Sequence, residues 1–363
     1  MFAQSNPELD ALLQLDPPVA VGVSGGKDSQ AAAIATFRHL DAIGHQGPRL
    51  LIHADLGMVQ WNDSLSVYES LARHFGVELI IVKRKAGGLM ERWESRWLSS
   101  RRRYEALETV TLVPCWSTPS LRFCQSETKT HPIMAALRKR YPKQTIVNVT
   151  GVRREESARR AKTQIVSHDP VTRWTDWRPI ADFSTGDVFQ AITDAGLTPH
   201  PAYSCFGMSR VSCRLCIMQS LPDMRAAVLR PESHNLYRRM VALEAESGFA
   251  FQGSRWLGDI ARALLGDDLR DRFANGKRRA DARREAESAI TPVMRYVKGW
   301  PQRLLSQDEA GILANIRQRV SALYGFHSSC LDPSEIQDRY AALMDMKAER
   351  DRGQKTCQRM IVA

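Results

Sequence analysis

The sequence contains no apolar run long enough to span a bilayer. Its first residues, Met1 to Asn6, lack the basic and then apolar pattern of a secretory signal peptide. Internal repeats and low-complexity tracts are also absent. These absences argue against a membrane-embedded, secreted or repeat protein, and we expect a cytoplasmic globular protein with no membrane partner.

The sequence contains few cysteines, and fewer acidic than basic residues. The seven cysteines form an odd set, which in a cytoplasmic protein argues against a disulfide framework and favours metal-binding or catalytic thiols. The 51 Lys and Arg residues exceed the 40 Asp and Glu residues, and the net charge is +11. This excess favours anionic partners without distinguishing nucleotides, nucleic acids and acidic proteins.

The 363 residues, 43% hydrophobic and 25% charged, fit a globular protein with two domains or one extended domain. Strands are predicted at residues 18–23, 49–53, 78–82 and 145–150, and helices at residues 27–42, 64–75, 127–141 and 184–195. Strands separated by helices predict an α/β fold with a doubly wound, mostly parallel sheet. Such a sheet binds ligands at the carboxyl ends of its strands.

The β signal fades after about residue 221. Capping-box spacing occurs at Ser184/Asp187 and again, beyond the β-rich part, at Ser306/Glu309 and Ser334/Gln337. We therefore expect a nucleotide-binding domain over residues 1–220 and an α-helical C-terminal region over residues 221–363.

The segment Ser24-Gly25-Gly26-Lys27-Asp28-Ser29 links a predicted strand to a predicted helix. Backbone N–H groups and the positive end of the helix favour an anion in such a turn, and the glycines allow close approach. Lys27 adds a positive charge. The segment is not a Walker A loop, because no glycine stands five residues before Gly26 and Asp28 replaces the Ser or Thr. An ordinary Gly-rich turn is the alternative.

This hexapeptide resembles the pyrophosphate loop (PP-loop) of the N-type ATP pyrophosphatase superfamily. The superfamily includes adenylyl-sulfate and phosphoadenylyl-sulfate reductases, ATP-dependent thiolating enzymes and the ATP-pyrophosphatase/sulfurtransferase component of DNA phosphorothioation systems, which gives the strongest likeness. The resemblance spans about residues 18–220. It implies an adenine nucleotide alpha hydrolase-like fold whose nucleotide ligands include Ser24, Gly25, Gly26, Lys27, Asp28 and Ser29.

Two further segments carry the resemblance. The Asp-x-Gly after the second strand of the family is matched by Asp55 and Gly57, where a carboxylate can accept from ribose or hold a cation, although a simple turn is the alternative. The arginine-rich segment after the fourth predicted strand suits bidentate phosphate or sulfate binding, unless it is a solvated helix start. Its Gly-hydrophobic-Arg-x-x-x-Ser-x-x-Arg pattern is matched by Gly151, Arg153, Ser157 and Arg160, with Arg159 as an alternative to Arg160.

Cys213 and Cys216 form a C-x-x-C, and Cys205 lies eight residues before it. This spacing suits thiolate binding of zinc or an iron–sulfur cluster, and Cys124 is the best fourth donor. The segment around Cys124 resembles the Cys-Cys-x-x-x-Lys-x-x-Pro-Leu block of assimilatory adenylyl-sulfate reductases, with Phe123 in place of the first cysteine.

In those reductases the block shares a 4Fe-4S cluster with a distant C-x-x-C, and residues 200–213 look like the cluster-binding segment of phosphorothioation-type proteins. The resemblance therefore implies one 4Fe-4S cluster held by Cys124, Cys205, Cys213 and Cys216. A structural zinc and a redox-active dithiol are the alternatives. The remaining cysteines are expected to be small buried hydrophobic residues: Cys115, Cys330 and Cys357.

Basic residues interleaved with aromatic residues occur at residues 83–104 and 277–300. Such stretches either follow a nucleic-acid backbone and stack on bases, or form a solvated helix face above core tryptophans.

The resemblance implies ATP-dependent adenylation and sulfur transfer. The PP-loop would hold the β,γ-phosphates with Mg²⁺, a substrate oxygen would attack the α-phosphate, and sulfur would displace AMP. Lys27, Asp28 and Arg153 are the expected catalytic residues, with Lys27 and Arg153 neutralising charge. The acceptor could be a nucleic acid, and a cysteine desulfurase or other donor would supply sulfur.

The alternative is an adenylyl-sulfate or phosphoadenylyl-sulfate reductase that produces sulfite. Those enzymes carry a Glu-Cys-Gly-Leu-His-like tail, whereas Cys357 here stands in Lys355-Thr356-Cys357-Gln358-Arg359. A third possibility is a non-enzymatic nucleotide- or cluster-sensing subunit of a nucleic-acid-modifying complex. The sequence does not indicate an oligomeric state.

Overall fold

The computed structural model describes residues 3–362, and side chains as far as residue 353. The side chain of Cys357 lies outside the described residues. The chain forms two compact units, the first made of Met1–Arg92 and Ser117–Tyr237, the second of Trp93–Trp116 and Arg238–Ala363. No described helix is long and apolar enough to cross a membrane.

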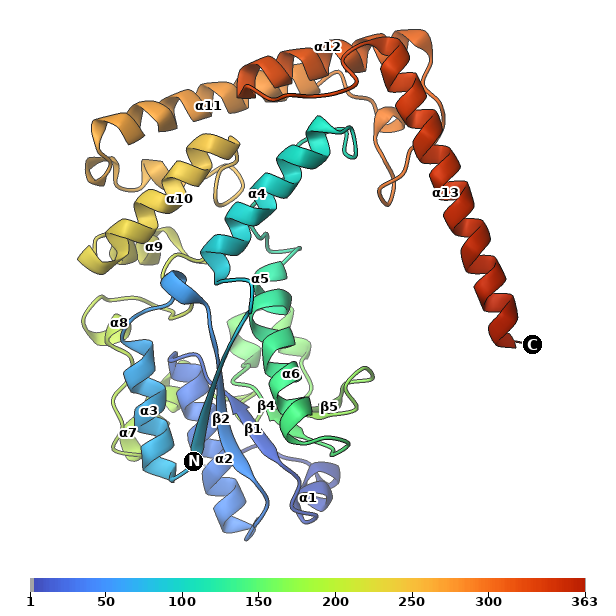
Figure 1. The fold of residues 1–363 in the computed structure, drawn as a ribbon. Helices are drawn as coiled ribbons and strands as arrows, with labels where there is room; N and C mark the ends of the chain where they lie inside the picture. The colour runs from blue at the N-terminus through green and yellow to red at the C-terminus, as the bar shows by residue number, and fades with distance from the viewer. Residues whose placement is uncertain (1–2, 363) are drawn as a thin grey trace. The chain divides into compact units, whose positions relative to one another are not determined.

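The first unit is an α/β sandwich around a six-stranded sheet of order β3-β2-β1-β4-β6-β5 (Figure 1). All neighbouring strands are parallel except β5 and β6. The strands are β1 (Val19–Gly22), β2 (Arg49–Asp55), β3 (Glu78–Lys83), β4 (Val147–Val149), β5 (Val166–His168) and β6 (Thr175–Trp177). The predicted fold class, a doubly wound and mostly parallel sheet with a helical C-terminal region, is confirmed.

The helices of the first unit pack on both faces of this sheet and beyond the carboxyl ends of its strands. They are α1 (Pro7–Leu13), α2 (Lys27–Ala42), α3 (Ser64–Phe75), α5 (Phe123–Gln125), the π-helical turn η2 (Ser126–Thr130), α6 (His131–Arg140), α7 (Thr185–Asp194), α8 (Pro201–Ser204) and α9 (Leu221–Val228), with 3₁₀ turns η1 (Gly57–Val59), η3 (Arg154–Glu156), η4 (Arg160–Lys162) and η5 (Pro231–Ser233). Helix α4 (Leu89–Glu105) begins in the first unit and α10 (His234–Ser247) ends in the second.

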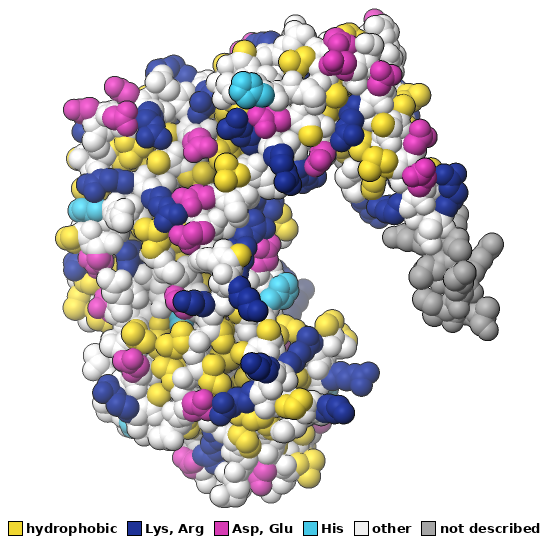
Figure 2. All heavy atoms as spheres, viewed as in Figure 1, with side chains coloured by type: hydrophobic (Ala, Val, Ile, Leu, Met, Phe, Trp, Pro, Cys, Tyr) yellow, Lys and Arg dark blue, Asp and Glu magenta, His cyan; other side chains and the backbone are white. Residues whose placement is uncertain are grey.

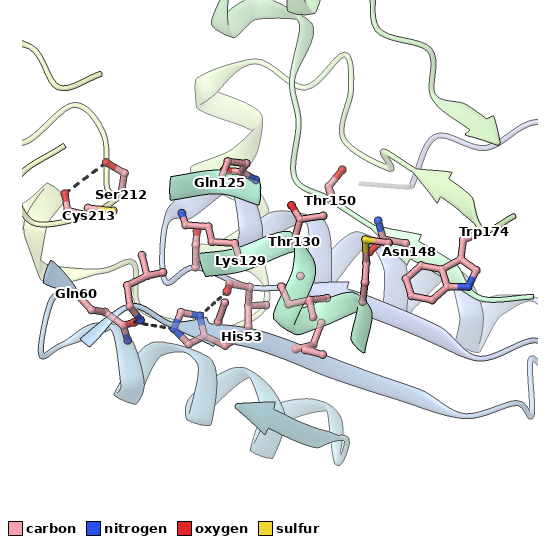
Figure 3. A pocket seen from close by; sticks show the side chains of 18 residues that line it. His53, Gln60, Gln125, Lys129, Thr130, Asn148, Thr150, Trp174, Ser212 and Cys213 are labelled. Carbon is pink, nitrogen blue, oxygen red and sulfur yellow. Dashed lines mark hydrogen bonds between the residues drawn. The ribbon is translucent and has the colours of Figure 1, made fainter. Parts of the chain in front are cut away.

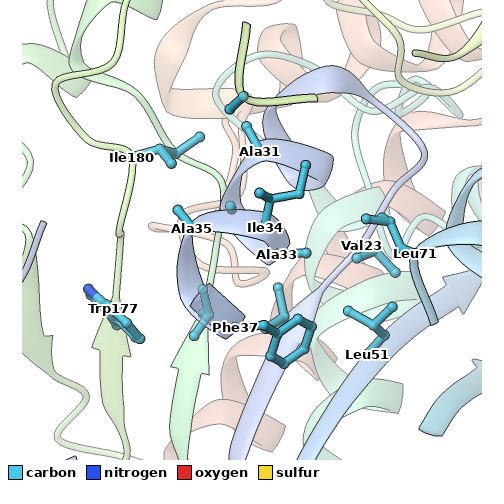
Figure 4. Packing of buried hydrophobic residues seen from close by; sticks show 14 of the residues in the cluster. Val23, Ala31, Ala33, Ile34, Ala35, Phe37, Leu51, Leu71, Trp177 and Ile180 are labelled. Carbon is cyan, nitrogen blue, oxygen red and sulfur yellow. The ribbon is translucent and has the colours of Figure 1, made fainter. Parts of the chain in front are cut away.

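Alternate residues of β1 point to opposite faces, as the two-residue period of a strand requires. Val19 and Val21 join the core beneath α1, α2, α3 and α7, which Figure 4 shows around Phe37 of α2. Ala20 belongs to a smaller core beneath α6, which includes Leu137 and Trp174. Because both faces are covered, the central strand β1 is an apolar run rather than an alternating pattern.

The strand order reverses at β1, which pairs with β2 on one side and β4 on the other. Ligands bind at this switch point in doubly wound sheets, in the crevice outside the carboxyl ends of the strands. The segments after β1 and β4 therefore meet there, since Val21 pairs with Val149.

Several predicted elements agree closely with the structure. Helices α2 and α3 have the predicted bounds, and Ser184 with Asp187 forms the predicted capping box of α7. The predicted helix 127–141 is in fact a π-helical turn followed by α6. Strands β5 and β6 were not predicted, because each has three residues of which two are polar, so neither forms an apolar run.

The second unit is helical. Besides the ends of α4 and α10 it contains α11 (Asp267–Glu287), α12 (Gln307–Tyr324) and α13 (Pro333–Val362), with 3₁₀ turns η6 (Leu257–Asp259), η7 (Arg262–Leu264) and η8 (Pro292–Met294). The expected domain boundary at residue 220 did not place residues 93–116 with these helices. They belong there because Trp93 and Trp116 pack against Phe251 at ring-centroid distances of 5.9 and 5.1 Å.

The capping box of α12, Ser306 with Glu309, is confirmed. The one predicted at Ser334 and Gln337 is wrong. Asp332 accepts from the Glu335 N–H at 3.0 Å, and the Gln337 side chain donates to the Leu305 carbonyl. An Asp two residues earlier can accept from the free N–H groups of the first turn as well as a serine does.

The aromatic residues of the first basic stretch are core residues. Trp93, Trp97 and Tyr104 are each at most 2% exposed, so they are not available to stack on bases. Arg283, of the second stretch, is buried over the Phe249 ring at 3.9 Å. On the face in Figure 2, basic and acidic side chains are interspersed over α11 and α12. A nucleic-acid partner stays a prediction.

Candidate nucleotide and thiol site

The PP-loop turns from β1 into α2 as expected. Gly25 has φ +78°, and a Cβ there would lie 2.9 Å from the Ser64 hydroxyl. The Ser29 hydroxyl donates to the Gly26 carbonyl at 2.8 Å and accepts from the Ser24 N–H at 3.2 Å. Gly26 caps α2 without a side-chain bond. The turn is thus held by its own serines and leaves the positive end of a 16-residue helix at the switch point.

Charged side chains surround the first turn of α2. The Lys27 ammonium lies 3.1 Å from the Asp28 carboxylate, whose other oxygen accepts from Arg153 Nε at 2.6 Å. Arg153 is 3% exposed and also donates to Glu155 and to the Phe183 carbonyl. Burial opposes the charge of Arg153, but the attraction and hydrogen bonds of Asp28 and Glu155 together outweigh it and raise the pKa of Arg153. Arg153 therefore fixes Asp28, which faces Lys27.

Gly151 joins β4 to this turn. A Cβ on Gly151 would lie 2.4 Å from the Asp28 carbonyl oxygen and 2.7 Å from its carbonyl carbon. Only glycine leaves room for α2 to begin this close to β4. Gly151 is therefore required by packing, which brings Arg153 within reach of Asp28.

Other predicted nucleotide ligands lie outside this charged cluster. The Asp55 side chain accepts from the Gly57 N–H at 2.8 Å, the turn geometry that was the alternative for this pair, and Gly57 has φ +70°. The Ser157 hydroxyl accepts from the Arg160 N–H, and Arg160 pairs with Glu156. Arg159 is exposed. The nucleotide roles of these residues stay predictions.

A cavity of about 260 Å³ opens at the carboxyl ends of β1, β2 and β4. Figure 3 shows Trp174 and Asn148 at one end, Ser212 and Cys213 at the other, and Lys129 and Thr130 between them. Ser24 of the PP-loop belongs to the lining. Ligand pockets in proteins measure roughly 300–1,000 Å³, so this cavity can hold part of a small ligand.

His53 connects the cavity wall to the PP-loop. Its ring nitrogens lie 2.8 Å from the Val23 carbonyl and 2.8 Å from Gln60 Oε1, and the ring stacks on Tyr68 with centroids 4.4 Å apart. Val23 immediately precedes the PP-loop. The loop after β2, which contains Gln60, is thus tied to the residue from which the PP-loop starts.

The thiols of Cys213 and Cys216 form a hydrogen-bonded pair. The bond from Cys213 is the largest cause that lowers the pKa of Cys216, with further help from the Met218 N–H and the Lys129 charge, whereas the same bond and burial raise the pKa of Cys213. Cys124 also acts electrostatically on Cys213. The pair therefore favours the negative charge on Cys216 over Cys213, and Cys213 lines the cavity.

The predicted four-thiol centre is only partly assembled. Cys205 is exposed, and its thiol contacts the Ser204 hydroxyl at 3.7 Å. As the described side chains lie, no three Cys, His, Asp or Glu residues form a group that could hold a metal ion. Soft thiolates at Cys213 and Cys216 beside Cys124 fit an iron–sulfur cluster or zinc chemically. The cluster stays a prediction.

Three residues of the site were missed. Lys129 belongs to the block that resembles the reductases, where it stands one residue later than the lysine of that pattern. The extra residue coincides with the π-helical turn η2, a form that accommodates one inserted residue. Tyr203, whose hydroxyl accepts from the Lys27 N–H at 3.0 Å, lies in the segment 200–213 that carries part of the resemblance, but it was not singled out. Arg214 gave no local signal, because it acts through distant partners.

Similarity to solved structures is weak. Phosphoadenylyl-sulfate reductase from Candida auris, in its phosphate complex, is 14% identical with a TM-score of 0.37, and the match covers 59% of this chain and 98% of that one. The U34-tRNA thiolase NcsA from Methanococcus maripaludis, with its 4Fe-4S cluster, is 14% identical with a TM-score of 0.36, over 69% of this chain and 73% of that one. No curated protein matches the chain.

A family model gives the decisive comparison. The phosphoadenosine phosphosulfate reductase domain matches residues 18–219. This range includes the PP-loop, the Gly151–Arg153 turn and the paired thiols, which share one site in the first unit. Because the match covers more than half of the chain, the protein belongs to the phosphoadenosine phosphosulfate reductase domain family.

Proposed function

We propose that this protein is a PP-loop ATP pyrophosphatase that adenylates an acceptor and replaces the adenylated oxygen with sulfur. One observation carries the proposal: a single cavity is lined by Ser24 of the PP-loop and by Cys213 of the thiol pair. A nucleotide held by the loop would therefore lie beside a sulfur atom.

The charges around α2 suit the first step. The acceptor oxygen attacks the α-phosphorus of ATP, the bond to the bridging oxygen breaks, and pyrophosphate leaves with its electron pair. Lys27 and the N-terminus of α2 would neutralise the β,γ-phosphates. Asp28, held by Arg153 at 2.6 Å, would bind Mg²⁺, which supplies further neutralisation when bound.

The second step replaces AMP. Hydrosulfide attacks the acceptor atom, an acceptor–sulfur bond forms, the acceptor–oxygen bond breaks and AMP leaves, so no electrons are exchanged. With a persulfide from a cysteine desulfurase, a thiol reductant must return two electrons. Cys124, Cys205, Cys213 and Cys216 would hold the 4Fe-4S cluster, which when bound would supply redox chemistry, since four thiolates leave no iron open to bind a further sulfur atom.

The family match favours a second candidate function, reduction of adenylyl sulfate or phosphoadenylyl sulfate. A thiolate would attack the sulfur atom, the sulfur–oxygen bond to phosphate would break, and a second thiol would release sulfite and leave a disulfide. Cys357 is the candidate nucleophile near the end of the chain.

Two assays on the anaerobically purified protein test the proposal. The first follows AMP and pyrophosphate from ATP with Mg²⁺, sulfide and pools of cellular RNA or DNA. The second follows sulfite from adenylyl sulfate or phosphoadenylyl sulfate with dithiothreitol. We expect pyrophosphate, and Lys27→Ala should lower its release by about 10²-fold, whereas the exposed Lys139→Ala on α6 should not. Equal release by Lys27→Ala, or sulfite as the only product, would reject the proposal.

A further inference from the structure

The thiol pair lies in a segment with little regular structure. No helix or strand is present between the end of α8 at Ser204 and the start of α9 at Leu221. Side-chain anchors must therefore fix where this segment lies, because backbone hydrogen-bond ladders do not. Arg214, which lies between the two cysteines, provides such a side-chain anchor.

Arg214 is 4% exposed, and it reaches the loop that follows β2. Its Nη2 donates to the Gln60 carbonyl at 2.8 Å and to Asn62 Oδ1 at 2.9 Å. Its backbone N–H donates to the Val59 carbonyl at 2.7 Å, and its guanidinium carbon lies 5.7 Å from the centre of the Trp61 ring. Four consecutive residues of one loop thus hold a single arginine.

The other terminal nitrogen of Arg214 extends the tether to a second segment. Nη1 donates to the Glu232 carbonyl at 2.6 Å, beyond α9. Hydrogen bonds from a charged donor are stronger than neutral ones, and the planar guanidinium can serve both segments at once. An uncharged or single-point donor at residue 214 could not make these contacts together.

The loop that Arg214 holds is the loop that contacts the nucleotide cavity. Gln60 bonds His53, and His53 bonds the Val23 carbonyl next to the PP-loop, both at 2.8 Å. A second tether holds the other end of the thiol segment, since the Tyr203 hydroxyl accepts from the Lys27 N–H at 3.0 Å. The sulfur-bearing segment and the nucleotide loop are therefore one connected network.

From this network we infer that Arg214 is a positioning residue, which holds the Cys213/Cys216 pair against the nucleotide cavity so that sulfur meets the bound nucleotide. The inference rests on the proposed function, because sulfur transfer is the reason for holding the thiols beside the nucleotide. Arg214 itself does not contact the nucleotide in this scheme. Changing Arg214 should therefore move the thiols and leave the affinity for the nucleotide almost unchanged.

A thiol bound to iron does not react with iodoacetamide, so the full-length protein is first freed of any bound metal with a chelator and kept reduced. Alkylation by iodoacetamide, followed by mass spectrometry of Cys213, then tests the inference. At ATP–Mg²⁺ ten times above Kd, about one-eleventh of the sites are free, so ATP should slow alkylation of wild-type Cys213 about tenfold. Arg214→Gln should keep ATP affinity within about twofold, but its protection by ATP should fall below about twofold. Arg225→Gln, an exposed arginine of α9, should behave as wild type.

The outcomes are decisive. Wild-type protection in Arg214→Gln, or loss of ATP binding by a variant that still melts cooperatively, overturns the inference. If Arg214→Gln does not fold, Arg214→Lys takes its place, because lysine keeps the charge but cannot span both segments. Wild-type protection in that variant also overturns it. If adenylyl sulfate protects wild-type Cys213 and ATP does not, the proposed function fails, and the same variants are compared with adenylyl sulfate.

Discussion

Gly151→Ala should damage the site through a single methyl group. The added Cβ would lie 2.4 Å from the Asp28 carbonyl oxygen, 2.7 Å from the Asp28 carbonyl carbon and 3.0 Å from the Ser29 nitrogen. All three are backbone atoms at the start of α2, so no side-chain rotation can relieve the contact. Either β4 or α2 must move.

The magnitude follows from this geometry. Overpacking of a core costs about 1–3 kcal/mol, and each kcal/mol lowers Tm by about 2–4 °C in a unit of this size, so we expect a loss of about 2–12 °C. Because the shift moves Asp28 away from Arg153 and Lys27, pyrophosphate release should fall by about tenfold or more.

The assay pairs thermal unfolding with pyrophosphate release, and Gly186→Ala is the matched control. Gly186 lies in the first turn of α7, and its nearest Cβ neighbour would be 3.6 Å away. Alanine there should leave Tm unchanged or raise it, because glycine in a helix costs about 1 kcal/mol relative to alanine. A Gly151→Ala protein with wild-type Tm and wild-type pyrophosphate release would refute the reasoning.

Two predictions concern the second unit. Arg317 is fully buried and donates to four backbone carbonyls, among them those of Tyr104 and Cys330. Arg317→Ala should therefore lower the free energy of unfolding, measured by urea titration, by about 3 kcal/mol or more. A loss under about 1 kcal/mol would contradict the view that these four hydrogen bonds stabilise the unit. Burial raises the pKa of Glu244 to about 8, despite three N–H donors. The folded state then binds more protons than the unfolded state between about pH 5 and 8, so stability should fall as pH rises through that window, by at most about 1.4 kcal/mol per pH unit. Glu244→Gln should flatten this pH dependence of Tm, and equal slopes in both proteins would argue against it.

Local signals in the sequence determined much of the first unit. The apolar run before Ser24 and the glycines after it predicted the turn from β1 to α2, because a left-handed φ at Gly25 and a close approach at Gly151 admit few other residues. Capping at Ser184 and Ser306 was equally local. The alternation of strands and helices was enough to predict the doubly wound sheet and its ligand-binding edge.

The sequence could not distinguish a charged residue that meets a ligand from one that holds another residue. Arg153 was expected to neutralise phosphate, and in the structure its guanidinium binds Asp28, Glu155 and the Phe183 carbonyl. Trp93 and Trp97 were consistent with base stacking, and both are buried. The local sequence shows which side chains are neighbours along the chain. Whether a side chain is buried depends on which distant segments pack over it.

What the amino-acid sequence determined by itself is the chemistry available: an anion-binding turn, an arginine-rich turn and a C-x-x-C. Only the tertiary structure decided that the turn and Cys213 share one cavity and that Arg214 ties the thiol segment to the loop after β2. The physical reason is chain separation. Residues 24 and 213 line one cavity because distant segments pack together at the carboxyl ends of the strands, and a contact between such distant positions leaves no periodic or local signal in either segment.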